Sequence, residues 1–374
     1  MKILSNFLEK HHDRVVGLDI LRSIAILLVV YYHGRFILPP HFRSLYDNIQ
    51  ILNIDGVSIF FVLSGFLIGG ILLKIINKTD FKKVDLINFW IRRWFRTIPN
   101  YYFILIILLI LRFVTRNDIG DFNWKYFIFF QNFLYPHPNF FPEAWSLAVE
   151  EWFYILFPLM CYIFLKLLKK KTKSIFVSAI IFIIIPLIIR ILKFNNGLVS
   201  IDIDSEIRKI VVYRLDCIMY GVIGAYIAFK HPNFWYKSRF SFLILGIILL
   251  IALYFNILNL KYIYFPLIFN VESIATFCFL PFLCCYKSTN NKILDSFFIF
   301  ISIISYSMYL LNLTPVQRVL IPTFNNLFKQ TNFFSYNIFL INYLFYWLFT
   351  IIGSYILYTF YEYPVTKLRD KIHF

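Results

Sequence analysis

The chain has 374 residues, of which 60% are hydrophobic, 21% aromatic and only 15% charged. Soluble domains carry about 25% charged residues, and several apolar runs here exceed the roughly 18 residues that span a bilayer, so a soluble globular class is excluded. The net charge of +17 does not indicate a nucleic-acid partner, because the basic residues lie in short loops between apolar runs, as in membrane proteins.

This pattern predicts an all-α polytopic membrane protein with one domain, residues 1–374, and about ten transmembrane helices. The polar N-terminus has no small-residue cleavage site, so we expect the first helix to be a retained anchor. The expected spans are about 15–37, 55–76, 97–114, 143–168, 174–192, 210–229, 240–258, 264–286, 294–313 and 336–361.

The connections between these spans set the expected orientation in the lipid bilayer. A short amphipathic stretch, 81–90, precedes the third span, and 115–141 is expected to be an aromatic outer loop. Most Lys and Arg residues fall on one side of this alternation, which predicts that both termini are cytoplasmic. The five cysteines are not spaced as metal ligands are. We therefore expect them to be packing residues, and we expect no metal site.

The first span carries three polar residues that are costly in a membrane: Asp19, Arg22 and His33. The eleven steps from Arg22 to His33 complete about three helical turns, which places both side chains on one face, about 16 Å apart along the axis. One interpretation is an Asp19–Arg22 salt bridge with a separate interfacial histidine. The other is a polar track that leads from one side of the membrane to a catalytic base on the other.

Two further stretches carry groups suited to anion binding and proton transfer. Arg93 and Arg96, one helical turn apart, can converge on a phosphate, although a stop-transfer cluster that binds anionic lipid heads is the alternative. In the fourth span Ser146, Glu150 and Tyr154 form a polar stripe. We expect Glu150 to orient His33, whereas Glu151 points about 100° away and serves in a supporting position.

Two polar elements of other spans have structural explanations. Ser64 and Gly65 thin the second helix, so that another helix or a slim ligand can approach its backbone. Arg214 and Asp216 are expected to form a structural ion pair in the sixth span.

Taken together, these stretches resemble the membrane acyltransferase 3 family, multi-pass enzymes that O-acylate cell-surface sugars. The resemblance covers nearly the whole chain. The matching stretches are the Arg22 and His33 pair, Phe60 to Phe66, Arg93 and Arg96, Trp145 to Glu150 with Phe153 and Tyr154, Arg214 to Asp216, and Ser305 to Leu310.

The resemblance implies transfer of an acyl group from acyl-coenzyme A, most simply acetyl-coenzyme A, to a hydroxyl of a cell-surface or lipid-linked polysaccharide. It implies a bacterial cytoplasmic membrane, with the donor on the inner side and the acceptor on the outer side. The donor's phosphates would bind Arg93, Arg96 and Arg22. His33 would act as a general base or become transiently acylated.

The chain departs from the family pattern at three points. Ser58 stands where many members have an acid, with Asp55 nearby, and Leu311-Asn312 stand where many have Trp-His. We expect the standalone form, without the soluble esterase-like domain that some members append. A transporter for a sugar or lipid is the alternative function, because buried charges can also line a substrate pathway.

Overall fold

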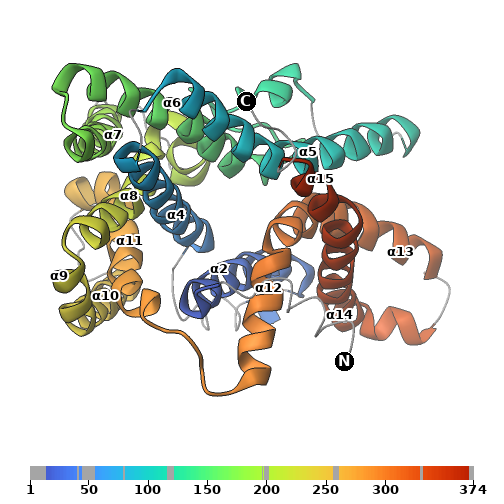
Figure 1. The fold of residues 1–374 in the computed structure, drawn as a ribbon. Coiled ribbons are helices and arrows are strands. Elements are labelled where there is room, and N and C mark those ends of the chain that lie inside the picture. Colours follow the sequence, from blue (N-terminus) through green and yellow to red (C-terminus); the bar gives the residue numbers. More distant parts are fainter. Residues whose placement is uncertain are drawn as a thin grey trace.

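A computed structural model describes residues 14–39, 42–43, 55–78, 81–115, 122–195, 197, 202–255, 261–328 and 332–369. All regular elements in these ranges are helical, which confirms the all-α class (Figure 1). The chain ends, 1–13 and 370–374, for which a cytoplasmic position is expected, lie outside the described residues.

The helical elements follow one another along the described parts of the chain. In chain order they are α2 (Val16–Gly34), η1 (Arg35–Ile37), α4 (Gly56–Lys78), α5 (Lys83–Thr115), η2 (Trp124–Ile128), α6 (Ala144–Leu168), α7 (Lys171–Asn195), η3 (Asp204–Arg208), η4 (Val211–Tyr213), α8 (Leu215–Lys230), α9 (Pro232–Lys237), α10 (Arg239–Tyr254), α11 (Lys261–Cys284), α12 (Lys292–Leu311), η5 (Asn312–Leu320), α13 (Ile321–Phe328), α14 (Asn332–Leu357), η6 (Tyr358–Glu362) and α15 (Tyr363–Leu368).

Eight helical segments in the described part of the chain are long and apolar enough to cross a membrane. The other two expected spans, 210–229 and 240–258, correspond to α8 and α10, which have 16 residues each. A helix of that length is about 24 Å long, less than the roughly 30 Å of a hydrocarbon core. The chain is therefore an integral membrane protein in which the ten predicted spans are approximate.

Helix α5 is longer than predicted. The amphipathic stretch 81–90 and the third span 97–114 were expected as separate elements, but Lys83–Thr115 form one helix with Pro99 inside it. The arginines at 92, 93 and 96 interrupt the apolar run, and such a charge cluster resembles a helix end in sequence. Because the helix continues through the cluster, these arginines project from a fixed helical frame.

Helices α4 and α8 pack closely because each has a glycine that faces the backbone of the other helix. A Cβ atom on Gly65 would lie 1.9 Å from the carbonyl oxygen of Ile218, and one on Gly221 would lie 1.9 Å from that of Val62. Of the two alternatives for Gly65, close approach of another helix or of a slim ligand, the structure shows the first. Ser64, its neighbour, points toward a cavity described below.

The aromatic segment before α6 packs onto the bundle. The rings of Tyr101 and Phe129 lie 4.5 Å apart, and the indole nitrogen of Trp152 donates a 2.9 Å hydrogen bond to the carbonyl of Phe129. The part of the predicted outer loop that is described, 122–141, therefore covers α5 and α6.

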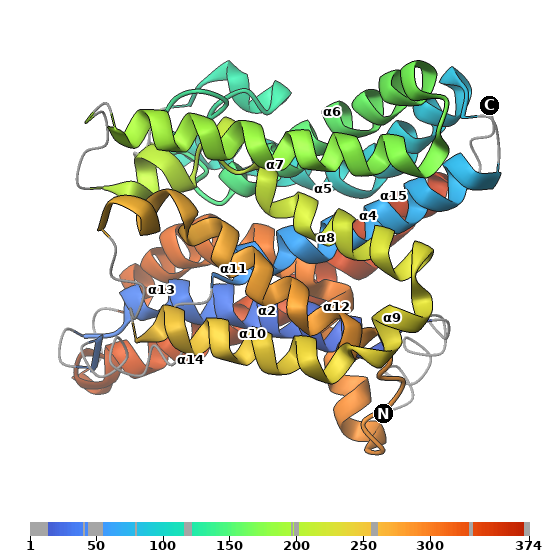
Figure 2. The same ribbon diagram turned by 90° about the vertical axis from the view of Figure 1, so that its left-hand side faces the viewer.

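Helix α2 packs against α4, α11 and α12 within the bundle (Figures 1 and 2). It begins at the right-hand end of the bundle in Figure 2, the end at which α15 also lies, and runs toward the left-hand end. Two polar residues of α2, Asp19 and Ser23, are buried within the bundle.

Candidate active site

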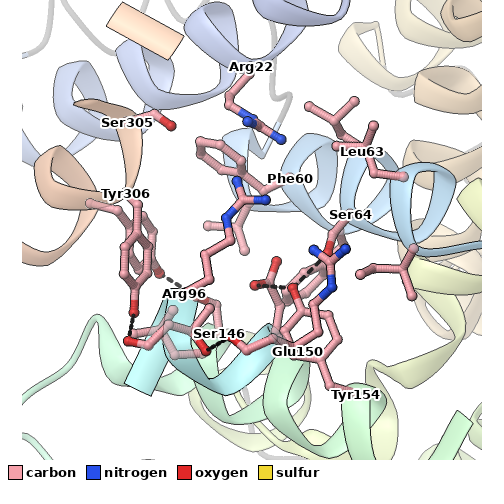
Figure 3. A pocket seen from close by; sticks show the side chains of 18 residues that line it. Arg22, Phe60, Leu63, Ser64, Arg96, Ser146, Glu150, Tyr154, Ser305 and Tyr306 are labelled. Carbon is pink, nitrogen blue, oxygen red and sulfur yellow. Dashed lines mark hydrogen bonds between the residues drawn. The ribbon is translucent and has the colours of Figure 1, made fainter. Parts of the chain in front are cut away.

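Two cavities adjoin α2. The first, which we call the arginine cavity, has a volume of about 100 Å³ and is lined by Arg22, Arg93 and Arg96 together with Ser64, Glu150 and Tyr154. Arg22 extends from α2 and Arg96 from α5 toward the same space (Figure 3). The structure thus brings together these six polar residues from four different helices, and all three predicted donor-binding arginines are among the lining residues.

The three arginines form no ion pair with the described carboxylates, and the nearby acids accept hydrogen bonds from neutral groups. Glu150 accepts from the Tyr154 hydroxyl at 3.2 Å and Glu151 from Thr97 at 2.6 Å. Glu362 accepts from Ser307 at 2.6 Å and from Asn100 at 3.1 Å. Arginine stays protonated in proteins, so the cavity presents three positive charges suited to an anion.

Asp19 does not pair with Arg22. Its carboxylate accepts from the Arg14 Nε at 2.9 Å and from the Ser302 hydroxyl at 2.6 Å. The salt-bridge interpretation of Asp19 with Arg22 is therefore wrong, since Arg14 lies just before α2 and takes the place of Arg22. Arg22 is left to face the arginine cavity.

The second cavity, which we call the histidine cavity, is larger, about 840 Å³. His33 and Glu143 line it, with aromatic side chains of Tyr32, Phe36 and Trp145. Val57 and Tyr309 line both cavities, so they form the wall between them. The Tyr309 hydroxyl is fixed in this wall by hydrogen bonds to Ser146 at 2.6 Å and to the Glu143 carbonyl at 3.0 Å.

The expected pairing of Glu150 with His33 is wrong. His33 Nδ1 lies 2.5 Å from the side-chain oxygen of Asn312, whereas Glu150 lines the arginine cavity. The cause is the position of α6: its first residues reach the histidine cavity, but Glu150, two turns further on, is already level with the arginines. Glu143, at the start of α6, is one of the four carboxylates that line the histidine cavity, with Asp55, Asp204 and Glu272, and it accepts two hydrogen bonds from Thr314.

An ionic cluster borders the histidine cavity. Arg208 donates to Asp55 at 2.9 Å and to Asp204 at 2.7 Å, and its guanidinium lies 4.8 Å from the Trp145 ring centroid. Burial alone would lower the pKa of Arg208, but the two carboxylates raise it above its usual value. Burial likewise opposes ionisation of Asp204, yet Arg208 and Lys209 hold its pKa below the usual range. The cluster therefore stays charged.

Comparison with known proteins identifies the family. The family described as "Acyltransferase domain" matches residues 15–359. The chain belongs to this family. This confirms the resemblance given by the sequence motifs and the expectation of an enzyme that transfers acyl groups.

Two curated relatives resemble parts of this acyltransferase. The protein named O-acetyltransferase OatA from Staphylococcus aureus is 27% identical over 246 residues, 60% of this chain and 36% of that protein. The protein named peptidoglycan O-acetyltransferase OatA from Listeria monocytogenes is 34% identical over 187 residues, 45% of this chain and 27% of that protein. The matches thus span about a third of these relatives. No solved structure gives a significant match.

Other predicted residues of the acyltransferase have different partners from those expected. Arg214 donates to Ser58 at 2.9 Å and lies 3.7 Å from Asp55, while Asp216 accepts from Arg190 at 2.6 Å. The predicted Arg214–Asp216 ion pair is therefore wrong, because residues two apart on a helix point in different directions.

Sequence reasoning missed several residues that shape the site. Asn312 enters the sequence analysis only as a departure from the family pattern, whereas Glu143 and Arg190 are absent from the predicted site residues. Buried polar residues in apolar spans are a signal that could have found them. The structure shows Arg190 and Asn312 with no measurable exposure, and Glu143 with 2%.

Proposed function

We propose that the chain transfers an acyl group, most simply acetyl, from acyl-coenzyme A to a hydroxyl of a cell-surface or lipid-linked polysaccharide. One observation carries the proposal: three arginines that form no ion pair with a described carboxylate line a cavity that shares Val57 and Tyr309 with a second cavity bearing His33. An anionic donor and a hydroxyl acceptor can therefore bind on opposite sides of a thin wall.

The donor's phosphates would bind Arg93, Arg96 and Arg22. These residues fit phosphate because their guanidinium groups are planar forks of donors, and no ion pair with a carboxylate of the described residues occupies them. The remaining lining includes Phe60, Leu63 and Tyr306 and encloses only about 100 Å³, which suits a slim chain rather than a bulky group. Bound there, the donor supplies an acyl group activated as a thioester.

The acceptor would occupy the histidine cavity. Its volume of about 840 Å³, aromatic side chains and several charged groups suit a sugar, whose ring packs on aromatic faces and whose hydroxyls seek hydrogen bonds. The relatives' names support the same class, since one is named a peptidoglycan O-acetyltransferase.

His33 would take the proton of the acceptor hydroxyl as that oxygen attacks the acyl carbon. The new C–O bond forms, the C–S bond breaks, and the departing thiolate receives a proton from the imidazolium. A positioned general base of this kind contributes typically 10²–10⁴-fold to a rate.

The proposed orientation places the arginine cavity toward the cytoplasm and the histidine cavity toward the outside of a bacterial cytoplasmic membrane. The distribution of basic residues supports this orientation. So does the position of the first and last helices, because the beginning of α2 and the whole of α15 lie at the same end of the bundle (Figure 2). Both termini would then be cytoplasmic.

The test uses purified chain in proteoliposomes with acetyl-coenzyme A labelled in the acetyl group and a polysaccharide acceptor. We expect labelled polysaccharide and free coenzyme A, and we expect His33→Gln to abolish transfer while coenzyme A still binds. Transport of an unaltered sugar or lipid, with no coenzyme A released, would contradict the proposal and favour a transporter.

Donor binding is tested separately by calorimetry. Arg96→Ala should weaken coenzyme A binding roughly 10- to 100-fold, because a hydrogen bond to a charged group contributes about 1.5–3 kcal/mol. Arg92→Ala removes the same charge from the same cluster but from a residue that does not line the cavity, so it is the matched control. Unchanged affinity in Arg96→Ala would instead favour the alternative that the cluster binds lipid headgroups, and equal losses in both variants would show only a general attraction between the basic cluster and the anionic donor.

A further inference from the structure

Asn312 lies where α12 ends and the π-helical turn η5 begins, and its side chain contacts His33. We propose that Asn312 is a positioning residue that holds neutral His33 in the tautomer protonated at Nδ1, so that the lone pair of Nε2 faces the histidine cavity. The catalytic consequence rests on the proposed function, but the tautomer itself does not.

The orientation of the Asn312 amide follows from its other contacts. Its nitrogen donates to the carbonyl oxygens of Met308 at 2.9 Å and Tyr309 at 2.8 Å. The reversed amide would place its oxygen against two carbonyl oxygens and lose both hydrogen bonds. The amide oxygen must therefore be the atom that faces His33.

An amide oxygen can only accept a hydrogen bond, so His33 Nδ1 must carry the proton. Tyr346 does not change this assignment, because its hydroxyl donates to the Val30 carbonyl at 2.9 Å and is 3.5 Å from the amide oxygen. In neutral imidazole one nitrogen is protonated and the other is not. Nε2, which has no hydrogen-bond partner among the described residues, is then the acceptor nitrogen.

The tautomer decides whether His33 can act as a base toward a group in the cavity. A histidine protonated at Nε2 would present an N–H to an acceptor hydroxyl and could not take its proton. Asn312 cannot support that state, since its nitrogen is held by the two helix carbonyls. It would have to give up these bonds before it could donate to Nδ1.

Nitrogen-15 NMR of histidine-labelled protein in lipid bilayers tests the proposal directly. The chain has seven histidines, and the signals that disappear in His33→Gln identify those of His33. We expect a protonated Nδ1 and an unprotonated Nε2 in the wild type. In Asn312→Leu, which has no acceptor, we expect a large fraction protonated at Nε2.

The same variant should lower the turnover of acyl transfer roughly 10- to 100-fold, part of what a general base contributes, with coenzyme A affinity unchanged. Thr314→Val is the control, because it removes a hydrogen bond between η5 and Glu143 without touching His33. It should leave the tautomer unchanged.

Protonation of wild-type His33 at Nε2 would overturn the proposal, as would an Asn312→Leu variant with unaltered tautomer or turnover. Because the NMR measurement needs no substrate, it decides the tautomer even if the wild type transfers no acyl group. Failure of the inference is therefore distinguishable from failure of the proposed function.

Discussion

Two adjacent glutamates on α6 show how strongly a residue's role depends on its direction. Glu150 lines the arginine cavity and accepts from Tyr154, which in turn contacts Ser64 at 3.0 Å. Glu151 is 3% exposed and accepts from Thr97 on α5 instead. Glu151 is buried whereas Glu150 is half-buried, and of the two only Glu150 lines the cavity in which the arginines would bind an anion.

This difference yields a prediction at the residue scale. Glu150→Gln keeps an acceptor for Tyr154 but removes a negative charge from among three guanidinium groups, so coenzyme A should bind roughly threefold to tenfold more tightly. Glu151→Gln, the matched control, should leave the dissociation constant unchanged. Calorimetry on both variants checks this, and weaker binding in Glu150→Gln would mean that the carboxylate holds the arginines in place.

The sequence predicted individual residues better than their partners. Helical spacing correctly places Ser146, Glu150 and Tyr154 among the residues that line one cavity. Helical spacing cannot give the position of α6 along the direction of α2. This relative position places Glu150 at the arginine cavity and away from His33. The partner of His33 is 279 positions away, on a helix whose packing no local pattern specifies.

At the scale of the element, hydrophobic runs located the helices, because a helix that crosses a membrane contacts lipid or other helices and is therefore apolar along most of its length. The exceptions have local causes. The cluster of Arg92, Arg93 and Arg96 resembles a helix end in sequence although it lies within α5. Arg214 lies directly before α8 and Asp216 in its first turn, so α8 begins later than the predicted span. Propensity and hydropathy report on one helix at a time, whereas crossings such as that of α4 and α8 depend on two.

The α4–α8 crossing gives the second prediction. Gly65→Ala would force a methyl group against the Ile218 carbonyl, and overpacking of this kind costs typically 1–3 kcal/mol. We therefore expect a lower unfolding temperature in detergent. Gly70→Ala on the same helix has no heavy atom within 4 Å of the added carbon and should be neutral or slightly stabilising. Equal behaviour of the two variants would contradict the close crossing.

At the scale of the whole molecule, the proposal requires the two cavities to open to opposite sides of the membrane. The distance along α2 from Arg22 to His33, about 16 Å, is roughly half of a hydrocarbon core. The wall of Val57 and Tyr309 lies between the cavities. A donor held by its phosphates at the arginines would then need to extend only past this wall to meet an acceptor at His33.

The third prediction concerns this orientation, which the basic residues indicate but which needs a direct measurement. In a background without Cys161, Cys217, Cys278, Cys284 and Cys285, an Asn139→Cys variant places a thiol on an exposed residue that lines the histidine cavity. A Lys170→Cys variant places one in the exposed connection between α6 and α7. A membrane-impermeant maleimide added to intact cells should label the Asn139→Cys variant. It should label the Lys170→Cys variant only after permeabilisation. Since α6 separates the two positions, labelling of both from outside would show that α6 does not cross the membrane. The reverse labelling pattern would place His33 on the same side of the membrane as acyl-coenzyme A. The donor would then not need to extend past the wall between the two cavities.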